Sequence, residues 1–200
     1  MLDKAQEFLK MGYNTLLVDF MGSGGSEGNQ TTIGHDEAEQ VKSCYEYLKK
    51  QGEKNIVLFG TSMGAAAILK SVRDHSLQPA ALIIECPFGS LYQTTCARFN
   101  TMGVPSFPMA GLLVFWGGAQ NGFWGFSHCP AKYAKAVTCR TLLMYGEKDD
   151  RVSRTETDEI FKNLAGPKKL QLFPNAGHEN YLTKYKREWI QSIEGFLGVE

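Results

Sequence analysis

A serine between two glycines stands out among the residues that could carry out chemistry. Residues 60–64 read Gly-Thr-Ser-Met-Gly, a G-x-S-x-G pattern with Ser62 at its centre. The apolar run 56–59 precedes the pattern, and the alanine-rich run 65–69 follows it. A strand that turns directly into a helix through such a pentapeptide holds the serine on a tight turn at the carboxyl edge of a sheet. We therefore expect Ser62 to be a nucleophile. We also expect both glycines to be needed, because a Cβ would collide with the adjoining strand or helix.

A serine hydroxyl becomes a useful nucleophile only when a base takes its proton and a third group orients that base. Among the four histidines, His178 alone follows an expected strand, residues 170–173, on a short loop of Pro, Asn and Gly. His35 and His75 are expected at solvated helix ends. His128 could line a pocket but has no strand to position it. His178 is the expected base, because it is the one histidine at a carboxyl strand end; the alternative is a histidine on a surface loop.

An acidic residue should follow another strand. Residues 142–145 are strongly apolar, and Asp149 and Asp150 come shortly after them. Asp149 is the preferred acid and Asp150 the near alternative, while either could instead cap the following turn. Glu85, at the end of the expected strand 80–84, is a further candidate. The order Ser, Asp, His along the chain is the order of hydrolases that contain G-x-S-x-G. The N–H of Met63, at the start of the helix, would then stabilise an oxyanion.

These residues need elements that position them. Expected strands alternate with helices, which predicts an α/β fold: a mostly parallel sheet flanked by helices on both faces. In such sheets, chemistry takes place outside the carboxyl ends of the strands. A hydrophobic content of 43% over 200 residues predicts one domain, residues 1–200. The expected strands lie at residues 15–20, 56–59, 80–84, 142–145 and 170–173.

One stretch breaks the alternation. Residues 88–129 lie between two expected strands, are too long for an ordinary loop, and contain many glycines and aromatic residues. The aromatic side chains could simply fill a core. We expect instead a small lid insertion above the carboxyl edge, with an apolar inner wall that binds substrate through Trp116, Phe123 and Trp124.

Composition narrows the possible partners. The 21 basic and 21 acidic residues cancel, so no basic surface for nucleic acid is expected. The five cysteines form no C-x-x-C pair, which predicts reduced thiols rather than a metal site. The most apolar segment, residues 109–119, is too short to cross a bilayer, and the first residues do not resemble a signal peptide. We expect a cytoplasmic protein that acts on a small molecule without a cofactor. Residues 22–27 read Gly-Ser-Gly-Gly-Ser-Glu and lack the last glycine of the G-x-G-x-x-G dinucleotide-binding loop, so we expect no dinucleotide site. Oligomeric state stays open.

Four segments together resemble a known family. They are YNTLLVDFMGSGGSEG, GTSMG, GEKDDRV and NAGHE, which lie in this order over nearly the whole chain. The sequence resembles α/β-hydrolase-fold proteins, most closely the serine-aminopeptidase and monoacylglycerol-lipase-like hydrolases. The resemblance implies Ser62 as nucleophile, Asp149 as acid, His178 as base and the Met63 N–H as an oxyanion donor. It implies a serine hydrolase that cleaves an ester, thioester or amide of a small apolar acyl or aryl group through an acyl-enzyme.

The sequence departs from that family in two places. Met21 stands where the family usually has an arginine. The strand and the His-Gly loop that supply the second oxyanion donor in the family would come before residue 1. In the family this strand lies between the strands that correspond here to residues 15–20 and 56–59. We expect the chain to be a fragment of a longer protein. The alternative is a non-catalytic binding or interaction module with the same fold.

Overall fold

Four short apolar runs form a parallel sheet in the computed structural model, which describes residues 1–198. Strand β2 is buried along its whole length, as its continuous apolar sequence requires. The register places Gly60 beside Ile84 and Ile84 beside Leu143, so the carboxyl ends of neighbouring strands lie together. The strands, in their spatial order, are β1 (Val57–Thr61), β2 (Ala81–Glu85), β3 (Arg140–Gly146) and β4 (Lys168–Phe173).

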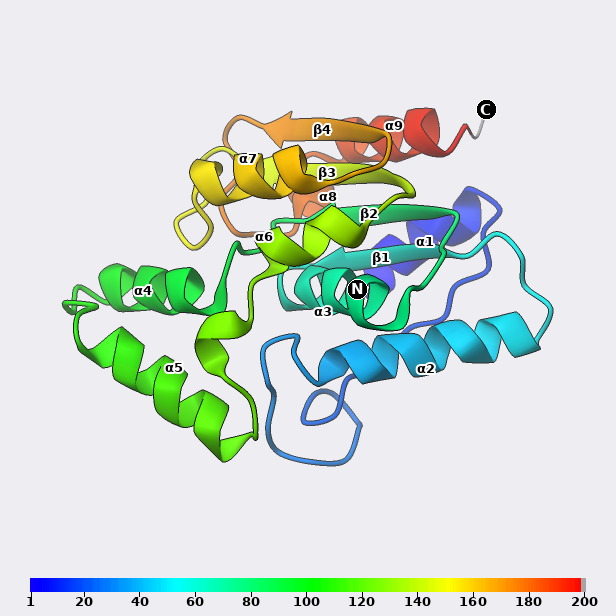
Figure 1. The fold of residues 1–200 in the computed structure, drawn as a ribbon. Helices are drawn as coiled ribbons and strands as arrows, with labels where there is room; N and C mark the ends of the chain where they lie inside the picture. Colours follow the sequence, from blue (N-terminus) through cyan, green and yellow to red (C-terminus); the bar gives the residue numbers. More distant parts are fainter. Residues whose placement is uncertain (199–200) are drawn as a thin grey trace.

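Helices cover both faces of this sheet (Figure 1), which confirms the predicted fold class. Two separate apolar clusters fill the spaces between the sheet and its two helical layers. On one face lie α2 (Glu37–Lys50), α3 (Met63–His75), α6 (Pro130–Tyr133), η2 (Ala134–Ala136) and α7 (Arg154–Asn163). On the other lie α1 (Leu2–Lys10), α8 (Tyr181–Lys184) and α9 (Lys186–Leu197). The expected end of the domain at residue 200 lies outside the described residues.

The insertion, residues 88–129, forms helices of its own between β2 and α6. These are α4 (Leu91–Thr101), α5 (Met109–Gln120) and the short η1 (Gly125–Ser127). Helices α4 and α5 pack against each other and extend beyond the end of the sheet, at the lower left of Figure 1. None of the helices in residues 1–198 has the length and apolar character needed to cross a bilayer.

The predicted first strand is wrong. Residues 15–20 adopt no regular secondary structure and do not pair with β1, which is the edge of the described sheet. Leu16, Leu17 and Val18 are 40–46% exposed. A strand needs a neighbour for its backbone N–H and C=O groups, and no strand lies between this segment and β1 in residues 1–198. Residues 15–20 have a strand-forming sequence, but nothing in the described chain pairs with them.

Candidate active site

Ser62 occupies a strained turn between β1 and α3, residues 60–64, which we call the elbow. Its backbone has φ 50° and ψ −111°, a region that residues with a side chain rarely adopt. Two backbone hydrogen bonds hold the turn: the Ser62 N–H donates to the Glu85 carbonyl at 2.8 Å, and the Ala66 N–H donates to the Ser62 carbonyl at 3.0 Å. The neighbouring strand β2 and the first turn of α3 thus fix the serine from opposite sides.

The two glycines of the pattern differ in their surroundings. A Cβ on Gly60 would lie 2.7 Å from the backbone of Gly64 and Ala65, and 2.7 Å from the Ile68 side chain. A Cβ on Gly64 would meet no atom within 4 Å. The predicted collision is therefore correct at Gly60 and wrong at Gly64, because the start of α3 is open at the second position.

The structure brings Ser62, His178 and Asp149 together. Nε2 of His178 lies 3.0 Å from Ser62 Oγ, and Nδ1 lies 2.8 Å from Asp149 Oδ2. The Asp149 side chain is fully buried, and its other oxygen accepts the backbone N–H groups of Arg151 at 2.8 Å and Val152 at 2.9 Å. A neutral imidazole fits both contacts, because Nδ1–H donates to the carboxylate and Nε2 accepts from the serine hydroxyl.

Backbone contacts join the loops that carry the acid and the histidine. After β3, the N–H groups of Glu147 and Lys148 donate to the carbonyls of Phe173 and Ala176, at 3.0 Å and 2.9 Å. A Cβ on Gly146 would lie 2.5 Å from the Ala176 carbonyl oxygen, so only glycine allows this approach. The two loops form one support, which sets the distance between Asp149 and His178.

The alternative acids lie elsewhere. Glu85 Oε1 accepts the indole N–H of Trp189 at 2.7 Å, and Oε2 accepts the Thr61 hydroxyl at 2.8 Å and pairs with the Lys4 ammonium. Lys4 and Glu85 are both buried. Of the three candidate acids, the one whose carboxylate His178 contacts is Asp149, rather than Asp150 or Glu85.

Cys86 lies next to the site but is a poor nucleophile. Burial, with smaller contributions from the charges of Glu85 and Asp149, raises the pKa of its thiol to about 12. Within the described chain, Cys86, Asp149 and His178 form the one group with the spacing of metal ligands, with their ligand atoms within 4.8 Å of one another. Asp149 and His178 already bond each other, and the thiol stays protonated at neutral pH, so we assign no metal to this group.

Met63 is the first residue of α3. Its N–H belongs to the first turn of the helix, where no carbonyl one turn earlier is available as a partner. The N–H therefore points out of the amino end of α3, beside the residue that carries Oγ, where the helix dipole favours a negative charge. This position is suitable for an oxyanion donor.

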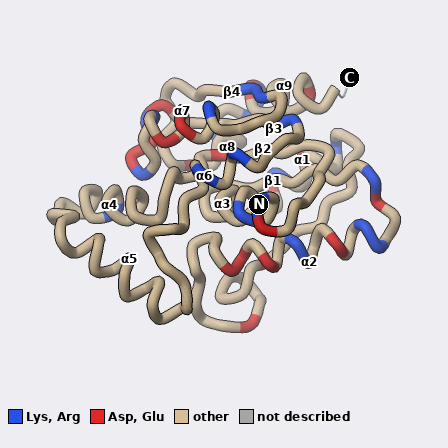
Figure 2. The backbone as a smooth tube through the Cα atoms, in the orientation of Figure 1, with Lys and Arg blue, Asp and Glu red and all other residues tan. Residues whose placement is uncertain are grey.

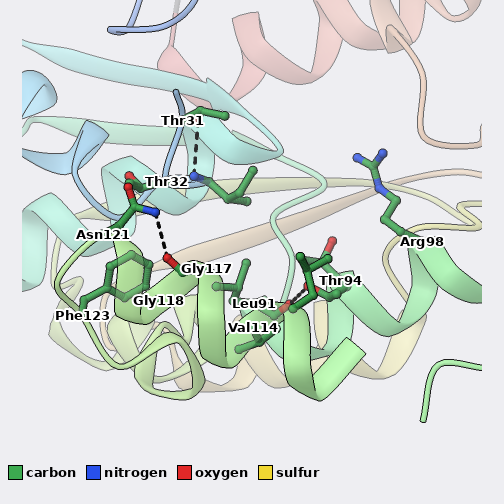
Figure 3. Close-up of a pocket in the computed structure, with 13 residues that line it drawn as sticks. Thr31, Thr32, Leu91, Thr94, Arg98, Val114, Gly117, Gly118, Asn121 and Phe123 are labelled. Atoms are coloured by element: carbon green, nitrogen blue, oxygen red, sulfur yellow. Dashed lines mark hydrogen bonds between the residues drawn. The ribbon is translucent and has the colours of Figure 1, made fainter. Parts of the chain in front are cut away.

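A cavity of about 390 Å³ lies between the insertion and residues 31–33 (Figure 3); Ser62, Asp149 and His178 are not among its lining residues. Its wall is mostly apolar, with Leu91 from α4 and Val114 from α5 among the lining residues. The Thr31 hydroxyl, on the same wall, contacts Met63 Sδ at 3.1 Å, which connects the cavity with the start of α3. The sequence did not indicate that residues 31–33 would form part of this wall.

Only one of the three predicted substrate-binding residues lines this cavity. Phe123 does so, and its ring stacks on His35 with centroids 3.8 Å apart. Trp116 and Trp124 do not line it and are 60% and 59% exposed. Trp116 faces solvent because α5 turns Ala110 and Val114 inward instead, and Trp124 is exposed just before η1.

Sequence reasoning missed the role of two residues that shape the cavity. The Glu37 carboxylate accepts the N–H groups of Thr32 at 2.9 Å and Gly34 at 2.8 Å, and so folds the loop before α2. His128 is buried, donates from Nε2 to the Ile33 carbonyl at 3.0 Å, and therefore ties the insertion to the same loop. A polar Thr-Thr-x-Gly stretch shortly before a helical Glu was the one available signal. It predicts only a helix cap.

Comparisons with known proteins show the family and the fold of the chain. A model of the prolyl oligopeptidase family matches residues 1–199. The uncharacterized protein YqkD of Bacillus subtilis is 25% identical over 194 residues, and the uncharacterized protein Rv2307c of Mycobacterium tuberculosis is 27% identical over 191. These alignments cover 95% and 94% of the chain, but only 64% and 60% of the two relatives. The chain thus spans less than two thirds of their length.

Solved structures show the same fold. The Pyrococcus furiosus esterase Pf2001 has a TM-score of 0.76 with 22% identity, over 99% of this chain and 75% of that one. The monoacylglycerol lipase of Paleococcus ferrophilus has a TM-score of 0.72 with 17% identity, over 99% and 88%. At these identities the likeness establishes the fold, and the chemistry has to be argued from the site.

Proposed function

Because the chain belongs to the prolyl oligopeptidase family and has the α/β-hydrolase fold, we propose that it is a serine hydrolase that acts through an acyl-enzyme. One observation carries the proposal: a continuous line of hydrogen bonds runs from Asp149 through His178 to Ser62 at the carboxyl edge of the sheet. Serine, histidine and aspartate in this geometry are suited to acyl transfer.

In the proposed reaction, His178 Nε2 takes the hydroxyl proton while Ser62 Oγ attacks the carbonyl carbon of the substrate. Asp149 stabilises the imidazolium that forms, and the Met63 N–H stabilises the negative oxygen of the tetrahedral intermediate. The intermediate collapses when His178 returns the proton to the leaving group. Water, activated by the same histidine, then hydrolyses the acyl-enzyme. No step uses a metal or an organic cofactor.

The cavity suggests which group the substrate presents. It is mostly apolar and has a volume at the lower end of the range for small-ligand sites. We propose that it holds a small apolar acyl or aryl group, with Val114 and Phe123 in contact with it, and that the insertion 88–129 acts as a lid. Because the structural relatives include esterases and a monoacylglycerol lipase, esters are the first substrates to test; thioesters and amides fit the same chemistry.

We further propose a cytoplasmic location and a single domain over residues 1–200. All five cysteines are free thiols, and three of them have a raised pKa because of burial. Persistent free thiols are typical of a reducing compartment.

A panel of p-nitrophenyl esters with acyl chains of increasing length tests the proposal. We expect saturable hydrolysis with a maximum at short or medium chains. Loss of Ser62 should remove essentially all catalysis that depends on the triad. The Ser62→Ala variant should therefore lose a factor of about 10⁴ or more in kcat/KM. Unchanged hydrolysis by this variant, with its folding checked by circular dichroism, would show that the serine is not the nucleophile.

A further inference from the structure

The outer part of the insertion carries no charge. Residues 99–131 contain no Asp, Glu, Lys or Arg, and α5 appears without a charged residue in Figure 2. Phe107, at 83%, is the most exposed of its large apolar side chains. We call the exposed apolar surface of this segment the apolar tip; it consists of Met102, Val104, Phe107, Met109, Leu112, Leu113, Phe115, Trp116, Trp124 and Phe126.

Helix α5 is apolar around its circumference. Ala110, Val114 and Gly118 face inward, while Leu112 and Trp116 belong to the exposed side. A surface helix in water normally has a polar outer face, and a helix that is apolar all round lies in a core or in lipid. The inner face of α5 already packs against α4 and η1. Its outer face, an apolar surface of the kind that marks an interaction site, therefore needs another partner.

We propose that the apolar tip docks on the surface of a neutral or zwitterionic lipid layer. Two properties of the tip fit this partner. Its lack of charge means that insertion desolvates no ionised group, and that no attraction to anionic lipid is built in. Its two exposed tryptophans, Trp116 and Trp124, have the amphipathic ring that prefers the boundary between lipid and water.

A protein partner fits the same surface less well. Protein interfaces surround their apolar centre with a polar rim and are enriched in arginine. Arg98, on α4, is the one charged residue between Glu85 and Lys132. The tip is also built from three separate pieces, the loop before α5, α5 itself and the segment around η1, and the exposed polar residues between the last two, Gln120 and Asn121, carry no charge. A lipid surface has no fixed shape and requires none of these features.

The apolar tip adjoins the cavity between the insertion and residues 31–33. Leu113 belongs to both, since it lines the cavity and is 58% exposed. An ester dissolved in the lipid layer would therefore pass from the tip into the cavity along an apolar path. Only this last step depends on the proposed hydrolase function; docking itself requires no catalysis and is tested in the Ser62→Ala variant.

Flotation with phosphatidylcholine vesicles tests docking directly. The chain has three tryptophans, of which Trp189 is fully buried, so a change in emission reports Trp116 and Trp124. We expect the protein to float with the vesicles, its emission to shift to the blue, and brominated phosphatidylcholine to quench it. Failure to float at millimolar lipid would overturn the proposal.

Two double variants locate the binding surface. Met109→Ser with Leu112→Ser removes two exposed side chains of α5, neither of which lines the cavity. It should lower vesicle binding by about tenfold or more, because each side chain loses its transfer into the apolar layer. The matched control, Leu16→Ser with Tyr47→Ser, changes side chains of similar exposure outside the insertion and should bind as before. Equal losses in both variants would contradict the proposal, as would a dimer that only the α5 variant abolishes, since a second copy would then be the partner.

Discussion

At the scale of single residues, the site combines a strained serine with a well-supported acid. Ser62 keeps a positive φ because β2 and α3 both bond its backbone. Asp149 is oriented by two backbone N–H donors that leave one oxygen for His178. Substitutions at the aspartates and at the glycines of this turn test these two features.

Substitutions of the two neighbouring aspartates, Asp149 and Asp150, should have very different effects on kcat. Asp149→Asn removes the carboxylate that holds the Nδ1–H tautomer of His178, so kcat should fall by about 10⁴ while the fold is kept. Asp150→Asn is the matched control and should change kcat by less than about twofold, because the His178 contact is made by Asp149. Steady-state kinetics on the preferred ester compares them. If Asp150→Asn has the larger effect, the acid has been assigned to the wrong residue.

Alanine substitutions at the two glycines of the elbow, Gly60 and Gly64, should have different effects on stability. Gly60→Ala forces a Cβ against the backbone at the start of α3 and should destabilise the protein by about 1–3 kcal/mol. Gly64→Ala meets open space in a helix and should be neutral or add up to about 1 kcal/mol of stability. Urea unfolding of both variants gives the comparison. Equal losses would mean that the space at Gly64 is not available.

At the scale of elements, two buried contacts fix the layers around the site. His128 joins the insertion to the loop before α2, and its Nδ1 lies 3.1 Å from the Tyr133 hydroxyl. Lys4 joins α1 to the sheet beneath the elbow through Glu85. Each contact buries a titratable group, and each predicts a specific loss of stability.

Stability should fall in mild acid because of His128. Burial lowers the pKa of this imidazole to about 4, against 6.5 for the unperturbed group, and the charge of nearby His35 acts in the same direction. Between about pH 4 and pH 6.5, the unfolded chain therefore binds a proton on His128 while the folded chain does not. Above pH 6.5 this residue does not reduce the free energy of unfolding. As the pH falls from 6.5 toward 4, the free energy of unfolding decreases by an amount on the order of 3 kcal/mol.

The variant His128→Gln should remove that part of the pH dependence, since glutamine can still donate to the Ile33 carbonyl but does not titrate. Urea unfolding between pH 7.5 and 4 would show a flatter profile for the variant than for the wild type. Parallel profiles would place the acid sensitivity at another group.

The buried ion pair should matter far more than an exposed one. Lys4→Met leaves the Glu85 carboxylate buried without its cation and should cost about 3–5 kcal/mol. Lys184→Met breaks the 2.9 Å pair with Glu179, in which both side chains are more than 40% exposed, and should cost less than about 1 kcal/mol. Thermal unfolding compares them. Similar small losses would mean that α1 is held by its apolar contacts alone.

At the scale of the whole molecule, the features that could be predicted from the sequence are those that depend on local sequence pattern. Apolar runs between helices placed β1 to β4, and the residues after three strands supplied Ser62, Asp149 and His178, which the structure brings together. Strand ends were informative because parallel strands carry their loops to one edge.

What the sequence did not reveal depends on contacts between distant segments. Residues 15–20 have strand-forming residues, but pairing needs a neighbour that no local pattern shows. The role of His128 depends on the Ile33 carbonyl, which lies 95 residues earlier in the chain. Trp116 resembled a pocket residue by type, and only the packing of α5 shows that it faces outward.

The central claim is that Ser62 is an activated nucleophile, and covalent labelling tests it most directly. A fluorophosphonate reacts with a serine only when a base withdraws its proton and the site accepts the phosphonyl group. Intact mass spectrometry of the folded protein should show one adduct, and peptide mapping should place it on Ser62. The Ser62→Ala variant should remain unlabelled. Absence of an adduct on the folded protein, or equal labelling of the variant, would contradict the account and favour a binding module with this fold.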